Sequence, residues 1–256
     1  MKLKNPRLTY DLQALKGYSA LVGVDEAGRG ALAGPVVAAA VRLTEEFYRD
    51  SERIEGCRAI RDSKRISEFQ REHLFSLMQI WKEADVIDFS WAQATVGEIE
   101  QYNILGATQL AMERALEILD QRALSNMKMP RWDESSLFTP VSKDARVNKP
   151  TVRVLLDGRP MKRFRFKHEG LVQGDDKSLA IAMASIVAKV QRDHIMSELD
   201  TEFPEYGLAR HKGYGTQLHK LSIMESGEAS VHRPSFLRKF LLRSKEPSVQ
   251  MDLLLF

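Results

Sequence analysis

The order of the predicted strands and helices indicates an α/β domain followed by a small helical C-terminal part. Short apolar runs alternate with longer amphipathic stretches, two of these runs flank a glycine-rich turn, and the tail contains only short helical patterns. The chain has 256 residues, of which 43% are hydrophobic and 29% are charged. This composition allows a sizeable core and excludes a globally disordered chain.

The first elements along the chain predict a β-hairpin. Residues Ser19–Val24 are apolar and end at an acidic pair, and a glycine-rich loop follows at Gly28–Pro35. Residues Val36–Leu43 are again apolar and β-branched. Two short strands joined by such a turn are typical of antiparallel neighbours.

Two capping boxes predict where helices begin. Ser67 and Gln70 have the S-x-x-Q spacing, so a helix is expected from Ser67 to about Lys82. A strand is expected at Asp85–Ala92, and a second box at residues 95–98 begins another helix. That helix has an amphipathic stripe made of Ile104, Thr108, Ala111, Ala115 and Ile118.

The rest of the chain predicts an insert, a strand, a long helix and a tail. The stretch from Asp120 to Pro150 has few apolar residues and several prolines and serines, and an inserted loop is favoured over an interaction surface. Thr151–Leu156 predicts a strand, and Leu179–Leu199 predicts a helix with a buried first half. These boundaries predict an N-terminal extension over 1–18, a main domain over 19–203 and a helical region over 204–256.

Composition also bears on the compartment. The single cysteine, Cys57, excludes an internal disulfide framework and a cysteine-rich zinc site. The N-terminal residues are basic without an apolar stretch behind them, and no apolar run approaches the roughly 20 residues of a spanning helix. We therefore expect a cytoplasmic protein with no membrane partner. The net charge of +3 permits a polyanionic partner without demanding one.

Acidic residues stand at predicted strand ends and before the long helix: Asp25, Glu26, Asp157, Asp175 and Asp176. Functional residues of open α/β sheets gather at the carboxyl ends of strands. Carboxylates that converge there need a compensating cation, and oxygen ligands without cysteine suit Mg²⁺ or Mn²⁺. Such a cluster supports two-metal phosphoryl chemistry.

Each of these acidic positions also has an ordinary structural interpretation. A carboxylate at a strand end is most often a solvated turn residue, and one before a helix is most often a cap. Adjacent Asp25 and Glu26 point to opposite faces of a regular strand. Both reach one site only where the strand ends or bulges.

Two further stretches bear on binding. Gly28, Arg29 and Gly30 allow close backbone approach and offer an arginine to a phosphate, although a plain tight turn has the same pattern. The basic stretch Arg159–Lys167 alternates cations with two phenylalanines. It predicts either a phosphate-facing strip or an exposed edge strand with solvated charges. The six histidines lack the spacing of a zinc hydrolase.

The sequence GVDEAGRG at residues 23–30, followed by LAGPV at 32–36, resembles the signature of the ribonuclease HII family, the bacterial type 2 ribonucleases H. The resemblance continues in the family's order at residues 62–64, 102–104, 157–158, 174–178, 184–190, 211–214 and 232–236. It implies an RNase H-like fold with a mixed central sheet flanked by helices, with residues 19–203 as the catalytic domain and a small C-terminal helical subdomain.

The resemblance also implies an activity. Family members cut the RNA strand of RNA–DNA hybrids and cut on the 5′ side of a single ribonucleotide in duplex DNA. They leave 3′-hydroxyl and 5′-phosphate ends and use two-metal-ion catalysis, here with Mg²⁺ or Mn²⁺. The physical logic agrees, because a 2′-hydroxyl is what distinguishes RNA from DNA.

The family's site residues are carried over position by position. Its four metal ligands match Asp25, Glu26, Asp157 and Asp175, and Asp175 is preferred to Asp176 because it directly follows a glycine. The turn of Gly28, Arg29 and Gly30 is implied to contact the ribonucleotide and read its 2′-hydroxyl, and Tyr214 to stack on the sugar on the 3′ side of the junction. Lys64, Asn103 and Lys177 match family positions near the substrate.

Some features leave alternatives open. The tail at residues 251–256 is apolar, and packing on the body is favoured over binding to a replication sliding clamp, since a glutamine-led motif is not clear beyond Gln250. We expect a monomer. Competing functions are another RNase H-like phosphoryl transferase, a non-catalytic hybrid-binding module and a small-molecule phosphate binder. The last lacks the Lys-Ser/Thr end of a phosphate loop.

Overall fold

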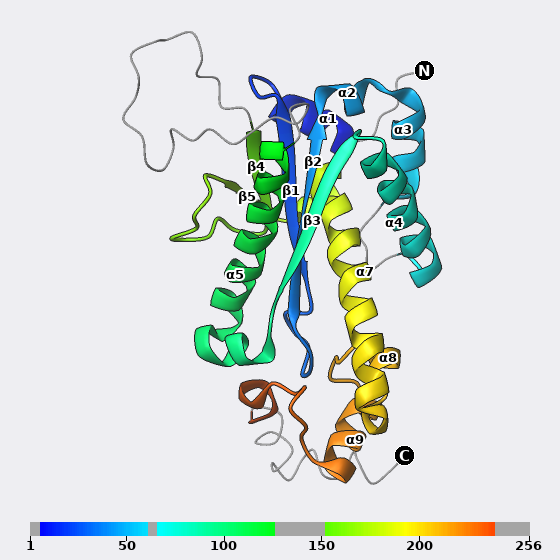
Figure 1. The fold of residues 1–256 in the computed structure, drawn as a ribbon, viewed down its shortest axis with the longest axis vertical. Coiled ribbons are helices and arrows are strands. Elements are labelled where there is room, and N and C mark those ends of the chain that lie inside the picture. The colour runs from blue at the N-terminus through cyan, green and yellow to red at the C-terminus, as the bar shows by residue number, and fades with distance from the viewer. Residues whose placement is uncertain (1–5, 61–65, 126–151, 239–256) are drawn as a thin grey trace. The chain divides into compact units, whose positions relative to one another are not determined.

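The computed structural model describes residues 6–60, 66–125 and 152–238, and it contains a mixed five-stranded sheet flanked by helices (Figure 1). The strand order is β3-β2-β1-β4-β5. The strands are β1 Ala20–Ala27, β2 Val36–Thr44, β3 Ile87–Ala94, β4 Val152–Asp157 and β5 Glu169–Leu171. The predicted mixed sheet with flanking helices is confirmed.

The pairing of β1 confirms the predicted hairpin. β1 is antiparallel to β2 in unbroken register from Ala20 opposite Thr44 to Ala27 opposite Val37. It is parallel to β4, and that pairing runs as far as Val24 opposite Leu156. β4 is in turn parallel to β5. β1 extends three residues beyond its predicted end, so the acidic pair belongs to the strand itself.

The helices are α1 Pro6–Ala14, α2 Glu45–Arg49, α3 Ser51–Gly56, α4 Glu68–Glu83, α5 Val96–Ser125, α6 Gly174–Lys177, α7 Leu179–Glu202, α8 Leu208–His211 and α9 Gln217–Ser226. Both capping boxes are confirmed. Ser67 accepts from the N–H of Gln70, and Thr95 exchanges hydrogen bonds with Glu98. Among the described residues, no helix is long and apolar enough to cross a bilayer.

Helix α5 differs from its prediction at two points. Asn103 interrupts it with φ 58° and ψ 172°, and the Asn103 side chain accepts from the N–H groups of Leu105 and Gly106 to begin the helix again. The helix also continues to Ser125, so the predicted loop start at Asp120 is wrong. The remainder of the predicted insert lies outside the described residues.

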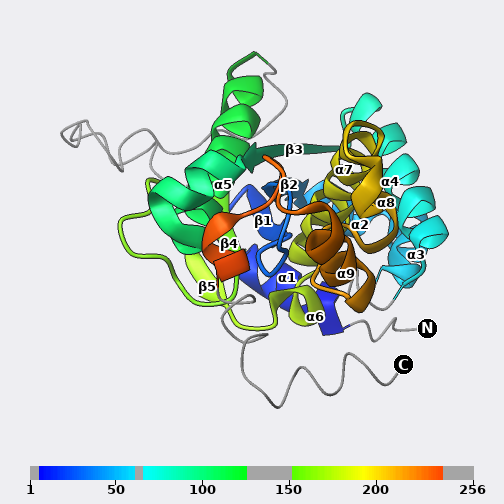
Figure 2. The ribbon, with the colours of Figure 1, turned by 90° about the horizontal axis from the view of Figure 1, so that it is seen from below.

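The described residues divide into two compact units. Unit 1 takes its residues from Met1–Ala27, Val37–Gln93 and Thr108–Gln191, and unit 2 from Gly28–Val36, Ala94–Ala107 and Arg192–Phe256. In unit 1, α5 covers one face of the sheet, while α4 and α7 cover the other (Figure 2). Unit 2 has its own small core around Met196, Tyr206 and Ile223. The domain boundaries drawn from the sequence stay a prediction.

Candidate active site

Asp25 lies near the end of β1 on the sheet face that α7 covers. Its strand partner is Ala39, which belongs to the core packed against α7. The Asp25 carboxylate is 6% exposed and bonds to Ser185 of α7, and its Oδ1 accepts the N–H of Glu26 at 2.7 Å. The alternation of side chains along a strand thus turns this carboxylate inward rather than to solvent.

Two further carboxylates act on Asp25 at this strand end. Burial raises the pKa of Asp25 well above its usual value, and the charges of Glu26 and Asp157 raise it further. Its hydrogen bonds oppose the shift without cancelling it. Carboxylates at such short separations repel one another, so the cluster favours a bound cation.

Asp157 and the turn that carries Asp175 are joined by a hydrogen bond. Asp157 ends β4, and its Oδ1 accepts the N–H of Gly174 at 2.7 Å. A Cβ at Gly174 would lie 2.6 Å from Ile181 Cδ1 and 3.1 Å from Asp157 Oδ1, so a larger residue would have to displace these side chains. Asp175 follows directly, and its Oδ1 accepts the N–H of Asp176 at 3.1 Å.

Glu26 does not share the sheet face of Asp25. It lies opposite Ala38 in a register without a bulge, so its side chain starts on the other face from Asp25. The pairing of β1 with β4 runs only to Val24, which leaves Glu26 at an unpaired strand end on that side. β1 itself continues through Glu26 to Ala27, so the strand neither ends nor bulges at the acidic pair, although the charge of Glu26 still acts on Asp25.

The donor set fits a hard divalent cation. The four candidate ligands offer only carboxylate oxygens, which suit Mg²⁺ or Mn²⁺. One oxygen each of Asp25, Asp157 and Asp175 is held by a backbone N–H. Within the described ranges, no group of three or more histidine, cysteine, aspartate or glutamate side chains is already arranged to hold a metal ion.

In unit 2, two buried arginines bind backbone carbonyls in and just after the glycine–arginine–glycine turn. Arg192 donates to the carbonyls of Ala33, Pro35 and Lys212 at 2.9–3.2 Å. Arg233 donates to the carbonyls of Arg29, Ala31 and Gly34 at 2.8–3.2 Å. Burial lowers the pKa of Arg192, and burial together with the charge of Arg192 lowers the pKa of Arg233 to about 9.

Gly28 is required by this packing, whereas Gly30 is not. Gly28 has φ +92°, and a Cβ there would lie 1.9 Å from Arg192 Nε. A Cβ at Gly30 would meet nothing within 4 Å, and the φ of Gly30 is not positive. The packing of unit 2 therefore does not require a glycine at position 30. Because Gly30 has no side chain, the space beside the turn is open.

The other predicted substrate residues are at the surface. The Tyr214 ring is 36% exposed and lies 5.3 Å from the Arg192 guanidinium. Asn103 is exposed at the break in α5. In unit 1, Lys177 is exposed and donates to the Val172 carbonyl at 2.6 Å. Lys64 lies outside the described residues.

Sequence reasoning missed Arg192 and Arg233 as the supports of the turn. Arg192 follows Ser185 and Ala188 at helical spacing on the buried side of α7. A charged residue on an apolar stripe signals a buried cation that needs acceptors. Arg233 lies inside the family-like run at residues 232–236 and carries no such signal.

Three histidines support the loop that carries Tyr214. His219 donates from Nδ1 to the Tyr214 carbonyl at 3.0 Å, and its Nε2 lies 3.2 Å from Nε2 of His232. His232 Nδ1 lies 3.0 Å from the N–H of Ala229 and 3.3 Å from the Ala229 carbonyl; in the tautomer that accepts this N–H, its Nε2 donates to His219. His211 stacks on His219 with centroids 4.3 Å apart. Burial and the neighbouring imidazoles disfavour the charged form of His219 and His232.

Acid should therefore loosen this loop. Burial lowers the pKa of His219 to about 4 and also lowers that of His232, on which Glu205 and Glu228 act in the opposite direction. Because the folded pKa lies below the unfolded value, the stabilisation is complete above about pH 6.5 and is lost toward pH 4. We expect a loss on the order of 2 kcal/mol, seen as faster amide exchange over residues 206–232.

The exposed His73 supplies the control for that prediction. His219→Gln should flatten the pH dependence between pH 6.5 and 4, whereas His73→Gln should leave it unchanged. An equal acid response in both variants would contradict the role of His219.

The basic stretch forms a bent loop rather than a strip of strand. The stretch itself contains no strand, since β5 begins only at Glu169. Its Arg165 pairs with Glu117 of α5. Phe164 and Phe166 are half-buried with ring centroids 6.2 Å apart. The loop's other cations are exposed: Arg159, Lys162, Arg163 and Lys167. The predicted separation of aromatics from charges is present, without the predicted strand.

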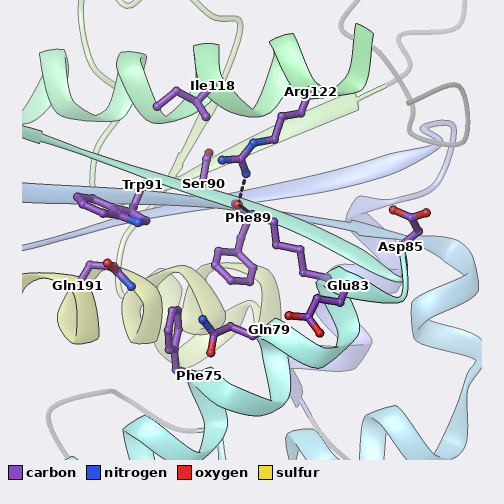
Figure 3. A pocket seen from close by; sticks show the side chains of 11 residues that line it. Phe75, Gln79, Glu83, Asp85, Phe89, Ser90, Trp91, Ile118, Arg122 and Gln191 are labelled. Atoms are coloured by element: carbon purple, nitrogen blue, oxygen red, sulfur yellow. Dashed lines mark hydrogen bonds between the residues drawn. The ribbon is translucent and has the colours of Figure 1, made fainter. Parts of the chain in front are cut away.

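A pocket of about 750 Å³ in unit 1 lies along β3, at the edge of the described sheet (Figure 3). The candidate ligands are not among its lining residues. Lys82 and Arg122 both donate to the Phe89 carbonyl, at 2.6 and 2.8 Å, and lie 3.5 and 3.4 Å from Asp88. These cations occupy the Phe89 carbonyl of the edge strand β3. This opposes the addition of a strand from another chain at that edge.

A mixed sheet with carboxylates gathered at its strand ends is an arrangement suited to a phosphodiester hydrolase. The family model for Ribonuclease HII matches residues 22–239. Ribonuclease HII of Fusobacterium nucleatum is 41% identical over 246 residues, which cover 95% of this chain and 96% of the relative. The chain belongs to the ribonuclease HII family. Membership supports ribonuclease H endonuclease activity on RNA–DNA hybrids.

Solved structures agree on the fold. Bst-RNase HIII in complex with Mn²⁺ has a TM-score of 0.59 at 15% identity, covering 94% of this chain and 74% of that one. The RNase HII in the PCNA:RNase HII complex from Archaeoglobus fulgidus has a TM-score of 0.57 at 19% identity, covering 89% and 98%. The predicted family and fold are both confirmed.

Proposed function

We propose that this protein incises on the 5′ side of single ribonucleotides in duplex DNA as well as cutting the RNA strand of hybrids. The products are 3′-hydroxyl and 5′-phosphate ends. The observation that carries the chemistry is the repulsion of the buried Asp25 carboxylate by Glu26 and Asp157 in a ribonuclease HII chain.

The residues present suit a two-ion site. Asp25, Glu26, Asp157 and Asp175 would hold Mg²⁺ or Mn²⁺ ions, which when bound supply positive charge for an attacking water and for the leaving 3′ oxygen. The chain positions these ligands through backbone N–H bonds to Asp25, Asp157 and Asp175. Burial of Asp25 beside Ser185 keeps that carboxylate in one orientation.

The glycine–arginine–glycine turn is proposed to recognise the 2′-hydroxyl. Arg192 and Arg233 take up carbonyls of residues 29–35, which leaves recognition to the other groups of the turn. The open space at Gly30 supports a close ligand, because the fold does not use it. Tyr214 is proposed to stack on the sugar 3′ of the junction, with Asn103, Lys177 and Lys64 near the substrate.

The test is cleavage of a labelled DNA duplex containing one ribonucleotide, with Mg²⁺, Mn²⁺ or EDTA. We expect one metal-dependent cut on the 5′ side of the ribonucleotide and no cut in the all-DNA control. Cleavage of both duplexes would identify a general nuclease of the same fold. Tight binding without cleavage in either metal would identify a non-catalytic hybrid-binding module.

Partner and compartment remain predictions. A monomer in the cytoplasm is expected, and the single cysteine is compatible with that compartment. The Archaeoglobus fulgidus relative was solved with PCNA, but the apolar residues 251–256 lie outside the described part of this chain. Clamp binding stays the alternative to packing of this tail.

A further inference from the structure

The N-terminal helix α1 contacts the turn that carries Asp175 through two side chains. Arg7 and Asp11 are four residues apart, so they lie on one face of the helix. Arg7 reaches α6, and Asp11 reaches the start of α7. We propose that Arg7 and Asp11 form a brace that positions Asp175, an inference that rests on the proposed role of Asp175 as a metal ligand.

Arg7 holds two successive residues of α6. Its Nε donates to the Asp175 carbonyl at 2.7 Å, and its Nη2 donates to the Asp176 carboxylate at 3.3 Å. Its Nη1 donates to the Ile60 carbonyl at 2.8 Å, and the side chain is only 13% exposed. The planar guanidinium fixes all three directions at once, which an ammonium group cannot do.

The turn needs such support because it is short. α6 has four residues and begins after Gln173, whose φ of 56° is left-handed. An isolated single turn is unstable, since nucleation fixes several dihedral angles for one hydrogen bond. The contacts of Arg7 with Asp175 and Asp176 therefore limit the orientations open to the Asp175 carboxylate.

Asp11 fixes the other side of the same turn. Its carboxylate is fully buried, and Oδ2 accepts the N–H of Ala180 at 3.0 Å and the hydroxyl of Tyr48 at 2.8 Å. Ala180 is the second residue of α7, so a side chain of α1 caps α7. The brace thus holds the chain both at Asp175 and five residues beyond it.

Arg7 acts through Asp175, which makes it a positioning residue. When the groups that orient a metal ligand are removed, the activity of the enzyme typically falls by about 10–100-fold. We expect Arg7→Ala to lower kcat by about that factor on the ribonucleotide duplex, with KM within about twofold. Arg7→Lys should be intermediate, since it keeps the charge without the fork.

The matched control is Arg49→Ala, which removes a 74% exposed arginine paired with Glu45. Amide exchange over residues 174–180 is measured on each variant without metal or substrate. It should rise about tenfold or more in Arg7→Ala and stay unchanged in Arg49→Ala. Unchanged exchange in a folded Arg7→Ala, or raised exchange with unchanged kcat, would overturn the brace.

The two hypotheses fail differently. A wild-type enzyme that does not cut the ribonucleotide duplex contradicts the proposed function, and the exchange measurement still decides whether Arg7 holds the turn. If Arg7→Ala does not fold, Asp176→Asn removes only the carboxylate partner of Arg7. That variant should raise the same local exchange by a smaller factor, and unchanged exchange would again overturn the brace.

Discussion

Asp25→Asn is expected to abolish cleavage, by about 10³-fold or more, while the protein still binds the ribonucleotide-containing duplex. The physical reason is that the variant removes one negative charge and one oxygen ligand from the carboxylates that would hold the cations. A factor of 10³ corresponds to roughly 4 kcal/mol of transition-state stabilisation. Single-turnover cleavage and duplex binding are measured on the same preparation.

The same substitution should also stabilise the metal-free protein. Asp25 is buried and repelled by Glu26 and Asp157, so its raised pKa means that its charged form destabilises the fold at neutral pH. The amide that replaces the carboxylate lacks that charge, and the melting temperature in EDTA should rise by about 2–4 °C for each kcal/mol removed. The control is Glu46→Gln, at an exposed carboxylate of α2.

Two results would contradict this assignment. Full activity of Asp25→Asn would show that Asp25 is not a metal ligand. A loss of activity accompanied by a lower melting temperature would indicate that the variant damages the fold rather than the site.

Arg192→Met is expected to destabilise unit 2 by about 3–5 kcal/mol, because it leaves the buried carbonyls of Ala33, Pro35 and Lys212 without their donors. The methionine fills the aliphatic part of the space, so the lost hydrogen bonds dominate the change. Discrimination between a ribonucleotide duplex and an all-DNA duplex should fall with it. Amide exchange over residues 28–36 and 206–232 reports the local effect.

The control for this prediction is Arg210→Met, because Arg210 is exposed on α8. It should leave both the exchange and the discrimination unchanged. Arg192→Lys keeps a charge but cannot serve three carbonyls in different directions, so an intermediate loss is expected. A stable Arg192→Met with full discrimination would show that the carbonyl contacts do not position the turn.

Local patterns were sufficient for most of the sheet and the long helices. Capping boxes at Ser67 and Thr95 identified the starts of α4 and α5, because those signals involve residues three apart in the chain. The hairpin followed from its glycine-rich turn. The break in α5 at Asn103 was not predicted, because in the sequence Asn103 looks like any polar residue on an amphipathic helix, and only the structure shows that its side chain caps the second segment.

The candidate site divides in the same way. Its family assignment rests on short motifs in the order that the family has, and sequence alone identified Asp25, Glu26, Asp157 and Asp175 as candidate ligands. Strand alternation could not say whether Asp25 and Glu26 meet. The unbroken register of β1 with β2 starts the two side chains on opposite faces of the strand, while the charge of Glu26 still raises the pKa of Asp25.

By itself, the sequence determined the order of the main strands and long helices, the family and the chemical type of the site, since these depend on neighbouring residues and on motif order. It did not predict helix α1, which lies in the predicted N-terminal extension. Only the tertiary structure decided which side chains support the site. Arg7 and Asp175 are 168 residues apart, and Arg233 and Arg29 are 204 apart. Contacts across such separations depend on how the packed elements bring backbone carbonyls within reach of a guanidinium, and a local pattern does not encode that.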